Sequence, residues 1–390
     1  MAVDMTAPAG RRILFTASTW SHLANFHRPY LRALADRGYL VDGACGGAPA
    51  ELSELARAIP LPLEKKMTSP KNLAAAAQLR RLLASGEYDL VSCHTALAAF
   101  FTRLAVEGLP KSRRPRVVCI AHGYLFDRNT SAAKTALLAG AEKLTAPVTD
   151  LVLTMNRWDF AYASTHRLGR RVANIPGMGV DFSSLDRADP RAGLALREEL
   201  GFGPERFLLV YGAEFSRRKS QEVLLRALAL LPQRAVLLLP GQGDLLPRCQ
   251  ALARELGVAD RVVFPGHVNM APWYAAANAV VPSSRSEGLP FNLMEAMHCG
   301  LPAVASDVKG HQDLICHGKS GLLYPYRDAA ACARQIQTLM DDPLLAQDLG
   351  RAGRQAMEPF RLDTVLPQVM EEYDRLLAAA AVAVLSLIHI

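Results

Sequence analysis

The segment at residues 282–302, PSSRSEGLPFNLMEAMHCGLP, decides how the rest of the chain is interpreted. It follows a short apolar run, residues 279–281, which is typical of a buried parallel strand. A polar turn ends this strand, and a helix is predicted to begin at about Phe291 and to end just before Gly300. A strand that leads through a loop into a helix presents backbone amides and the positive end of the helix dipole above the sheet. The segment therefore predicts a binding site for an anion, above all a phosphate.

Two carboxylates of this segment, Glu287 and Glu295, are eight residues apart, one in the loop and one about a turn inside the helix. A carboxylate repels phosphate, so we expect each to accept hydrogen bonds from hydroxyl groups of the same ligand. A site with backbone amides that bind a diphosphate, and carboxylates that bind ribose and sugar hydroxyls, fits a nucleotide sugar. The alternative is that Glu287 is a favourable charge near a helix start and that Glu295 is a solvated helix residue.

The segment resembles the E-x7-E motif of the retaining glycosyltransferases of family 4, with SEGLP, EAM and GLPAVAS all in place. The resemblance covers residues 12–378 and is closest to the enzymes of capsule, exopolysaccharide and lipopolysaccharide biosynthesis. It implies an α/β protein with the GT-B fold. Such a fold has two Rossmann-like, doubly wound parallel-sheet domains that face each other across a cleft, and a C-terminal helix that crosses back to the N-terminal domain.

Size and charge agree with two globular domains and suggest an anionic partner. Half of the 390 residues are apolar and 21% are charged, which is enough apolar sequence for two ordinary cores. Residues 1–182 hold 23 Lys and Arg against 14 Asp and Glu, a net charge of +9, and the other residues hold 21 against 23, a net of −2. The excess positive charge indicates that the N-terminal half contacts an anionic partner, either a membrane surface or a polyprenyl-diphosphate acceptor. The alternative is an ordinary solvated surface without a specific partner. No nucleic-acid partner is expected, because the basic residues are scattered and no nucleic-acid-binding motif accompanies them.

Cysteine usage and hydropathy indicate a cytoplasmic protein. The seven cysteines include no CxxC pair, which is typical of reduced thiols. No signal peptide and no uncharged apolar segment of membrane-spanning length is expected. We therefore predict a protein of the cytoplasm that contacts the inner face of the cytoplasmic membrane through its basic half. The last six residues, LSLIHI at 385–390, are predicted to be a non-native tail.

Short apolar runs alternate with helical patterns along the whole chain, which predicts parallel, doubly wound sheets. The predicted domains are an acceptor-binding domain at residues 1–182, a donor-binding domain at 183–360 and a crossover helix at 361–384. Strands are predicted at residues 13–17, 40–45, 90–94, 117–121, 151–154, 172–175, 207–211, 236–239, 262–264, 279–281, 303–305 and 321–323. Helices are predicted at residues 28–37, 73–84, 96–106, 221–231, 245–256, 292–299, 329–340 and 363–378.

Polar residues gather after three strands of the N-terminal half. The loop STWSHLANFHRPYLRAL follows the first strand and resembles the H-x-x-N-F-H-x-P-Y-L opening of family 4 enzymes, which places His22, Asn25 and His27 on the acceptor side. His94 ends a strand and is assigned to the acceptor side as well. His122 ends the next strand, and the resemblance implies that it contacts the donor sugar. The alternative for each is a structural histidine, with His27 as a helix cap.

In the C-terminal half the segment VYGAEFSRRKSQ places Arg218 and Lys219 at the start of a predicted helix. Cations there would clamp a diphosphate and stabilise charge on a leaving nucleoside diphosphate. The segment resembles the family's G-R-L-x-x-x-K-G element, in which Lys219 matches the lysine but Glu214 stands where many members have an arginine. Arg218 is our candidate for the second cation. The alternative is a solvated run of charges.

Further donor contacts are predicted in two loops and at the helix start. The PGQGD turn fails as a dinucleotide motif because Leu246 occupies the third glycine position, but the turn resembles the family's G-x-G element near the nucleotide, which assigns a binding role to Gly241. The alternative is a tight turn in which Asp244 caps the next helix. His267, in the next loop, is assigned to the base. Donor binding is also assigned to the helix start, namely Gly288, Leu289, Pro290, Phe291 and Asn292, with backbone amides around residues 289–292 for the diphosphate.

The resemblance implies retaining transfer of a hexosyl or N-acetylhexosaminyl group from a nucleoside diphosphate sugar, most often a UDP-sugar, to a glycan or lipid-linked acceptor in bacterial surface polysaccharide synthesis. It assigns the ribose to Glu295, the donor-sugar hydroxyls to Glu287, and the diphosphate to Lys219 with Arg218. No metal and no cofactor are expected, because the sequence contains no DxD, no HExxH, no Cys cluster and no P-loop motif. Two alternatives remain: a nucleotide-sugar epimerase of the same fold, and a non-catalytic module that binds nucleotide sugars or a membrane surface.

Overall fold

The structure is a computed structural model that describes the backbone of residues 10–388 and the side chains of residues 10–378. The chain divides into two compact units, unit 1 with Met1–Met178 and Val365–Ile390, and unit 2 with Gly179–Thr364. The sequence places the corresponding boundaries after residues 182 and 360. The predicted tail at 385–390 lies outside the described side chains, and its last two residues lie outside the described backbone.

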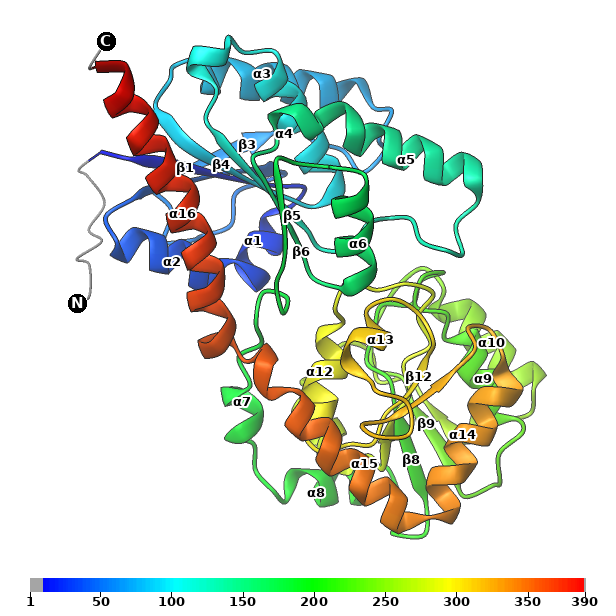
Figure 1. Ribbon diagram of the computed structural model, residues 1–390. Coiled ribbons are helices and arrows are strands. Elements are labelled where there is room, and N and C mark those ends of the chain that lie inside the picture. Colours follow the sequence, from blue (N-terminus) through cyan, green and yellow to red (C-terminus); the bar gives the residue numbers. More distant parts are fainter. Residues whose placement is uncertain (1–9, 389–390) are drawn as a thin grey trace. The chain divides into compact units, whose positions relative to one another are not determined.

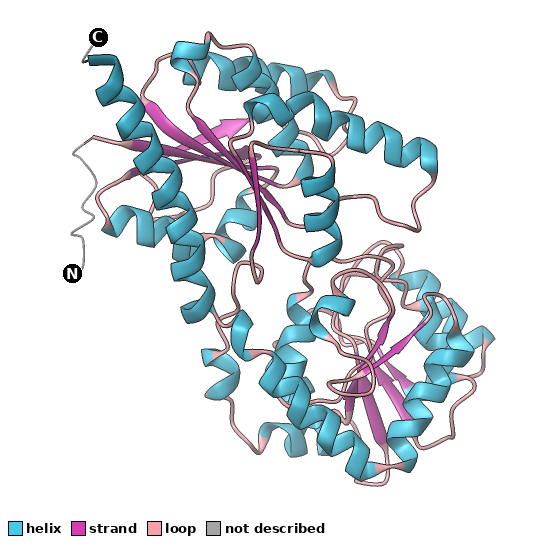
Figure 2. Ribbon diagram, viewed as in Figure 1, coloured by secondary structure: helices cyan, strands magenta, loops and turns pink. Residues whose placement is uncertain are grey.

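Unit 1 is built on a seven-stranded parallel sheet with the strand order β3-β2-β1-β4-β5-β6-β7 (Figures 1 and 2). The order changes direction at β1, which pairs with β2 on one side and with β4 on the other. Ligands of such sheets bind beyond the carboxyl ends of the strands at this switch point. The strands are β1 (Arg12–Ala17), β2 (Leu40–Gly46), β3 (Arg57–Leu61), β4 (Tyr88–His94), β5 (Arg116–Ala121), β6 (Leu151–Thr154) and β7 (Arg171–Asn174).

The helices of unit 1 connect these strands, and the C-terminal helix packs with them (Figure 1). Because both faces of the sheet are covered, strands β4 and β6 are almost entirely buried. Strand β6 is mainly apolar, whereas β4 also buries the polar side chains of Ser92 and His94. The helices are α1 (Trp20–Phe26), α2 (Arg28–Asp36), α3 (Pro70–Leu83), α4 (Ala96–Glu107), α5 (Ala132–Thr145), α6 (Arg157–Thr165) and α16 (Leu362–Ile388).

Helix α16 joins unit 1 through one apolar stripe. Val365, Val369, Tyr373 and Leu377 recur every fourth residue, and all four are buried. The hydroxyl of Tyr373 also lies 2.6 Å from Ser92 Oγ on β4. Side chains from the end of the chain are therefore part of the unit 1 core.

Unit 2 repeats the same architecture with shorter strands (Figures 1 and 2). A four-stranded parallel sheet has the order β10-β9-β8-β11, and the pair β12-β13 continues it through a parallel bridge between Val280 and Ala303. The strands are β8 (Phe207–Val210), β9 (Ala235–Leu238), β10 (Val262–Val263), β11 (Ala279–Val280), β12 (Val304–Ser306) and β13 (Leu322–Tyr324). The helices are α7 (Ser183–Asp186), α8 (Ala192–Glu199), α9 (Glu222–Leu228), α10 (Leu246–Glu255), α11 (Met270–Ala276), α12 (Phe291–His298), α13 (His311–Leu314), α14 (Ala329–Asp341) and α15 (Pro343–Ala356).

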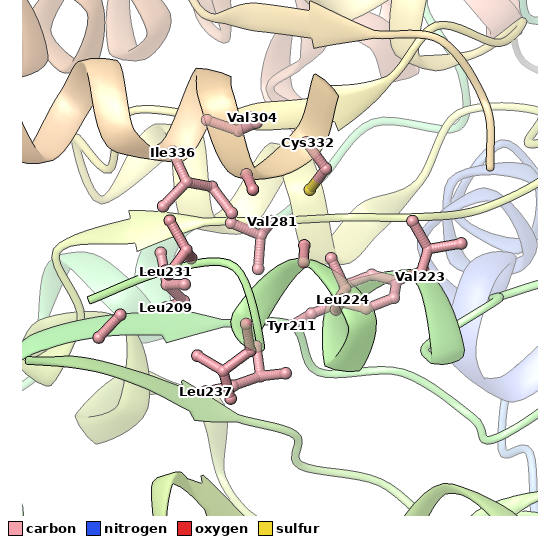
Figure 3. Close-up of a cluster of buried hydrophobic side chains, with 14 of the residues drawn as sticks. Leu209, Tyr211, Val223, Leu224, Leu231, Leu237, Val281, Val304, Cys332 and Ile336 are labelled. Atoms are coloured by element: carbon pink, nitrogen blue, oxygen red, sulfur yellow. The ribbon is translucent and has the colours of Figure 1, made fainter. Parts of the chain in front are cut away.

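The core of unit 2 lies between this sheet and helices α9 and α14 (Figure 3). Leu209, Leu237, Val281 and Val304 come from four different strand segments, and Ile336 comes from α14. Each of them is at most 1% exposed. Burying an aliphatic side chain contributes about 1.5–3 kcal/mol, so this cluster holds the strand ends, and the loops that follow them, in fixed positions.

Several elements differ from the sequence-based prediction. Strand β3 is not predicted, because RAIPL carries Arg57 and Pro60; it is tolerated as the edge strand of the sheet, where proline causes no loss of pairing. Eight helices are also not predicted, namely α1, α5, α6, α7, α8, α11, α13 and α15. The interpretation of Asp244 as a helix cap is wrong, since the N-cap of α10 is Leu245. Among the described residues, none of the helices has the length and apolar character needed to cross a bilayer.

Candidate functional site

Glu287 lies between two cations that come from another loop of unit 2. The carboxylate follows β11, Arg218 and Lys219 follow β8, and these two strands are neighbours in the sheet. Lys219 Nζ donates to Glu287 Oε1 at 2.6 Å, and Arg218 Nη1 donates to Oε2 at 2.5 Å. The glutamate side chain is 7% exposed, the lysine 12% and the arginine 50%. Residues that are almost seventy positions apart in the sequence thus form one charged cluster beyond the strand ends.

The cluster keeps Glu287 ionised. Burial alone would raise the pKa of its carboxyl group, but the charges of Lys219 and Arg218 outweigh burial and lower the pKa to about 2. Ser284 Oγ donates to Glu287 Oε1 at 2.6 Å and itself lies 2.7 Å from the hydroxyl of Tyr211. Two cations surround one carboxylate, so the cluster carries a net positive charge at neutral pH.

Main-chain contacts hold the two loops together. Ser283 Oγ donates to the carbonyl of Lys219 at 2.9 Å, and the N–H of Arg285 donates to the carbonyl of Arg218 at 2.7 Å. Ser306, at the end of β12, donates to a carbonyl of the Glu287 loop at 2.6 Å. Because three strand ends are tied together, the charged side chains are positioned before any ligand arrives.

Glu295 projects from α12 and has a different partner. The hydroxyl of Tyr274, on α11, donates to Glu295 Oε2 at 3.1 Å and lies at the same distance from the carbonyl of Asn292. Burial raises the pKa of Glu295, and the hydrogen bond from Tyr274 lowers it in part. The Asn292 side chain in turn donates to the carbonyl of Gly212, after β8, at 2.7 Å. No contact of the described residues joins Glu295 directly to the Lys219 cluster.

The segment that leads into α12 is arranged as the sequence predicts. The N-cap is Pro290, which supplies no side-chain cap, and the helix ends at His298 with Cys299 as its C-cap. Gly300 follows directly, and its φ of 83° is in the region that glycine tolerates. The predicted amide donors therefore lie at the positive end of the α12 dipole. The donor-binding residues predicted here are Gly288, Leu289, Pro290, Phe291 and Asn292, of which Leu289 and Pro290 are buried and the other three are half-buried. Pro290 has no N–H, so it shapes the helix start and does not donate.

Gly241 is required by a close approach of two loops. It has a φ of 143°, and a side-chain carbon at this position would lie 2.0 Å from the carbonyl oxygen of Ala213. Its N–H donates to the carbonyl of Gly266 at 2.7 Å, so the loops after β8, β9 and β10 lie against one another. His267 follows in the third loop and is exposed.

Two residues beside the cluster were missed by sequence reasoning. Lys309 lies in the loop after β12, His311 is the first residue of α13, and both are buried. A side-chain carbon at Gly310, between them, would lie 2.7 Å from the carbonyl of Gly288. His311 Nδ1 donates to the carbonyl of Ser306 at 2.8 Å, and burial lowers its pKa to about 4 although Glu287 opposes this. A signal was present, because the polar stretch VKGHQ directly follows a predicted strand.

In unit 1 the four candidate histidines form one cluster. His22 Nε2 lies 3.3 Å from His27 Nε2 and 3.3 Å from His122 Nε2, and His94 Nδ1 lies 3.4 Å from His122 Nε2. His27 and His94 are fully buried, and His22 and His122 are half-buried. Burial lowers the pKa of His22 to about 4 and lowers the pKa of the other three well below the ordinary value, so all four rings are neutral at pH 7.

Two members of the cluster, His27 and His94, have no exposed surface. Their assignment to the acceptor side stays a prediction. His27 is also the N-cap residue of α2, as its interpretation as a helix cap expects, although its side chain makes no cap hydrogen bond. Asn25 is exposed on α1, and none of the contacts between described residues joins it to the histidines.

Comparison with known proteins agrees with this architecture. The family model for "Glycosyl transferases group 1" matches residues 194–356, and the model for "Glycosyl transferase 4-like domain" matches residues 24–176. A protein of Bacillus subtilis (strain 168) named "Putative glycosyltransferase EpsD" is 32% identical over 93% of this chain and 96% of its own length. A D-inositol 3-phosphate glycosyltransferase of Streptomyces avermitilis is 28% identical over 74% of this chain and 65% of its own length.

Solved structures share the whole fold. A sucrose-phosphate synthase of Thermosynechococcus elongatus superimposes with a TM-score of 0.79 and 25% identity over 95% of this chain and all of that structure. The Anabaena protein HepE, solved in complex with UDP and glucose, gives a TM-score of 0.76 and 21% identity over 94% of this chain and all of that structure. Two Rossmann-like units and matches along both halves lead to one conclusion: the chain is a glycosyltransferase with the GT-B fold and belongs to family 4.

Proposed function

We propose that this glycosyltransferase moves a hexosyl or N-acetylhexosaminyl group from a UDP-sugar to a glycan or polyprenyl-diphosphate-linked acceptor during the synthesis of a bacterial surface polysaccharide. The transfer would retain the anomeric configuration and would need no metal at the diphosphate. One observation carries the proposal: a buried, ionised Glu287 is held at 2.5–2.6 Å by Arg218 and Lys219 beyond the strand ends of unit 2.

Charge supports the donor assignment. Without a ligand the two cations neutralise Glu287, and the excess positive charge of the cluster attracts a diphosphate. The bound diphosphate would share Lys219 and Arg218 with Glu287, whose oxygens would accept hydrogen bonds from hydroxyl groups of the sugar. The positive end of α12 would contribute at the same place.

Glu295 would hold the ribose. Tyr274 donates to its Oε2 atom, which fixes the side chain and leaves the Oε1 atom to accept from a ribose hydroxyl. The pKa of Glu295 is raised by burial, so a hydroxyl donor would further stabilise its ionised form.

The chemical step would exchange one bond for another at the anomeric carbon. The bond between this carbon and the diphosphate oxygen breaks, the acceptor oxygen bonds to the same face, and the acceptor proton passes to the leaving diphosphate oxygen. Lys219 and Arg218 would stabilise the negative charge that develops on the diphosphate; removal of a comparable donor lowers turnover about 10²–10³-fold in other enzymes.

Relatives support the choice of donor and pathway. HepE has been solved with UDP-glucose as well as with UDP and glucose, and a structure of WaaG, which has 18% identity, is titled as a glycosyltransferase involved in lipopolysaccharide biosynthesis. We carry these functions to this chain as part of the proposal.

The test is a binding and turnover series. The full chain would be screened by thermal shift against UDP-, GDP-, ADP- and TDP-sugars, where a ligand at a hundred times its Kd stabilises the folded state by about 2.7 kcal/mol. Sugar transfer would then be measured with the donor that binds. Stabilisation by UDP-sugars together with a loss of transfer in Lys219→Met is the expected result. Unchanged transfer in Lys219→Met would refute the role of the cluster.

The same series separates the alternatives. A nucleotide-sugar epimerase would convert the donor without any acceptor, which is detected by chromatography of the nucleotide sugars. A non-catalytic module would bind UDP tightly and give no product with any acceptor extract. The proposal expects acceptor-dependent release of UDP.

Membrane contact is the remaining part of the proposal, at the inner face of the cytoplasmic membrane. Helix α5 exposes Leu137 (74%) and Leu144 (60%) close to Lys134 and Lys143, which combines apolar and basic side chains on one helix. Leu137→Glu with Leu144→Glu should reduce sedimentation with vesicles of phosphatidylglycerol and phosphatidylcholine. Leu230→Glu, at an equally exposed leucine of unit 2, is the control. Equal sedimentation of all variants would argue against this surface.

A further inference from the structure

Four histidines of unit 1 converge at the carboxyl ends of its central strands. His22 lies on α1, His27 lies between α1 and α2, His94 ends β4, and His122 directly follows β5. One ring nitrogen of each lies within 4.8 Å of those of the other three, and this is the one group of metal-ligating side chains of this kind in the part of the chain that the structure describes. We call these four residues the histidine tetrad.

Three of the six nitrogen–nitrogen pairs of the tetrad have the spacing of a tetrahedral metal site, and the other three pairs lie within 4.8 Å. Three nitrogen–nitrogen distances are 3.3, 3.3 and 3.4 Å. A tetrahedral zinc site has Zn–N bonds of about 2.0–2.1 Å, which places neighbouring ligand nitrogens about 3.3–3.4 Å apart. The three contacts therefore have the length of tetrahedron edges.

Hydrogen bonds alone satisfy this arrangement poorly. A ring nitrogen has one hydrogen or one lone pair in the ring plane, never both. His22 Nε2 has His27 and His122 as neighbours, and His122 Nε2 has His22 and His94. Each of these two nitrogens must therefore share its single hydrogen or lone pair between two partners. A cation that accepts four lone pairs accounts for all three contacts at once.

A second layer of contacts orients one of the ligands. His94 Nε2 lies 2.9 Å from Ser92 Oγ, and Ser92 Oγ lies 2.6 Å from the hydroxyl of Tyr373 on α16. When Nε2 carries the hydrogen and donates to Ser92, the lone pair of His94 is on Nδ1, the atom that faces the tetrad. Metal-binding histidines are usually oriented by such a hydrogen bond at the other ring nitrogen. The ring of Phe15 also stacks on His94, with ring centroids 5.2 Å apart.

The ligand atoms select the class of cation. All four are imidazole nitrogens, and none is a carboxylate oxygen or a sulfur. Magnesium and calcium prefer oxygen ligands, whereas zinc and its neighbours among the transition metals bind imidazole well. Zinc has no competing geometric preference and most often takes four tetrahedral ligands.

We propose that His22 Nε2, His27 Nε2, His94 Nδ1 and His122 Nε2 bind one Zn²⁺ ion in a closed tetrahedral site. Four protein ligands leave no open coordination position, so the ion ties α1 and the α1–α2 junction to the ends of β4 and β5 and takes no part in chemistry. The site goes beyond the glycosyl transfer proposed above. With zinc bound, the Nε2 atom of His122 is a ligand and is not available to the donor sugar.

The first experiment measures metal content without any donor or acceptor, so its result does not depend on the proposed transfer. The full chain, purified without a polyhistidine tag, is stripped with a chelator and dialysed against Zn²⁺. We expect one bound zinc per chain by elemental analysis and a higher melting temperature with zinc than without it. With Co²⁺ in place of Zn²⁺ we expect the intense visible absorption of a tetrahedral ion.

Variants assign the metal to the tetrad. His94→Ala and His22→Gln should each weaken zinc binding by more than about 100-fold, because loss of a mere outer-shell partner already costs about 10–100-fold. Ser92→Ala tests that outer shell and should weaken binding by about 10-fold while the tetrahedral Co²⁺ spectrum is kept. His317→Ala, at an exposed histidine of unit 2, should change nothing.

One variant distinguishes the loss of a zinc ligand from misfolding of the chain. His94→Cys supplies a thiolate, which also binds zinc in tetrahedral sites, and should restore binding and add a thiolate-to-cobalt absorption in the near ultraviolet. The proposal is overturned if the wild-type chain binds no more zinc than His94→Ala, or if His22→Gln and His317→Ala bind it equally well.

Discussion

Replacing Lys219 with methionine is the sharpest test of the charged cluster. The change removes the 2.6 Å contact with Glu287 but keeps the length of the side chain, which is only 12% exposed. It leaves a buried carboxylate with Arg218 as its remaining cation. Because Arg218 is half exposed, solvent screens its charge.

The magnitude follows from the pKa of Glu287. A shift from 4.5 to about 2 corresponds to about 3 kcal/mol of preference for the ionised form in the folded state. Breaking a buried ion pair by removing one partner costs about 3–5 kcal/mol in other proteins. We therefore expect Lys219→Met to lower the free energy of unfolding of unit 2 by about 3 kcal/mol at pH 7.

The sign of the pH dependence is also determined. The pKa of Glu287 is lowered on folding, so its stabilising effect is complete above pH 4.5 and is lost as the pH falls from there towards 2. In the Lys219→Met variant, Arg218 is the only remaining cation that lowers the pKa of Glu287, while burial still raises it. The pKa of Glu287 therefore rises, and the carboxyl group protonates at a higher pH. The cost of the substitution should therefore be greatest at pH 7 and should shrink as the pH approaches 4.

Urea unfolding followed by tryptophan fluorescence measures this cost. Trp273 is the only tryptophan among residues 179–364, so a background with Trp20→Phe and Trp158→Phe reports on unit 2. Arg218→Met is the matched control and should cost less than about 1 kcal/mol. The double variant Lys219→Met/Glu287→Gln should recover most of the stability that Lys219→Met loses, because it leaves no buried carboxylate unpaired. Equal costs for the two single variants, or a cost that does not change with pH, would refute the reasoning.

Three further variants probe the neighbouring contacts. Gly241→Ala should lower the melting temperature strongly, because its side-chain carbon would lie 2.0 Å from a carbonyl oxygen. Gly257 also has a positive φ but open space around it, so Gly257→Ala should lower the free energy of unfolding by only about 1–2 kcal/mol. Calorimetry compares the two variants. Tyr274→Phe removes the hydrogen bond that lowers the pKa of Glu295, so the acid limit of donor binding, followed by titration calorimetry at several pH values, should move to higher pH. Tyr373→Phe should cost about 1 kcal/mol and increase hydrogen exchange in α16; unchanged exchange would contradict the role of its contact with β4.

Most of the architecture could be predicted from local patterns. Periodicity and capping act between residues that are close in sequence. Short sequence segments therefore predict the order of strands and helices, the strand–loop–helix segment around Glu287 and the end of its helix just before Gly300. The edge strand β3 could not be predicted in this way. Its residues carry no strand pattern, and pairing with β2 alone makes it a strand.

The sequence by itself determined which residues stand at the strand ends of each unit, and with them the family and the charged segments of the donor site. Only the tertiary structure decided which of these residues meet. His22 and His122 are 100 positions apart, and Ser92 and Tyr373 are 281 apart, yet each pair is in contact. The reason is topological: the strand order β1-β4-β5 brings the carboxyl ends of β1 and β5 close together. Helix α16 belongs to unit 1, where Tyr373 contacts Ser92 on β4.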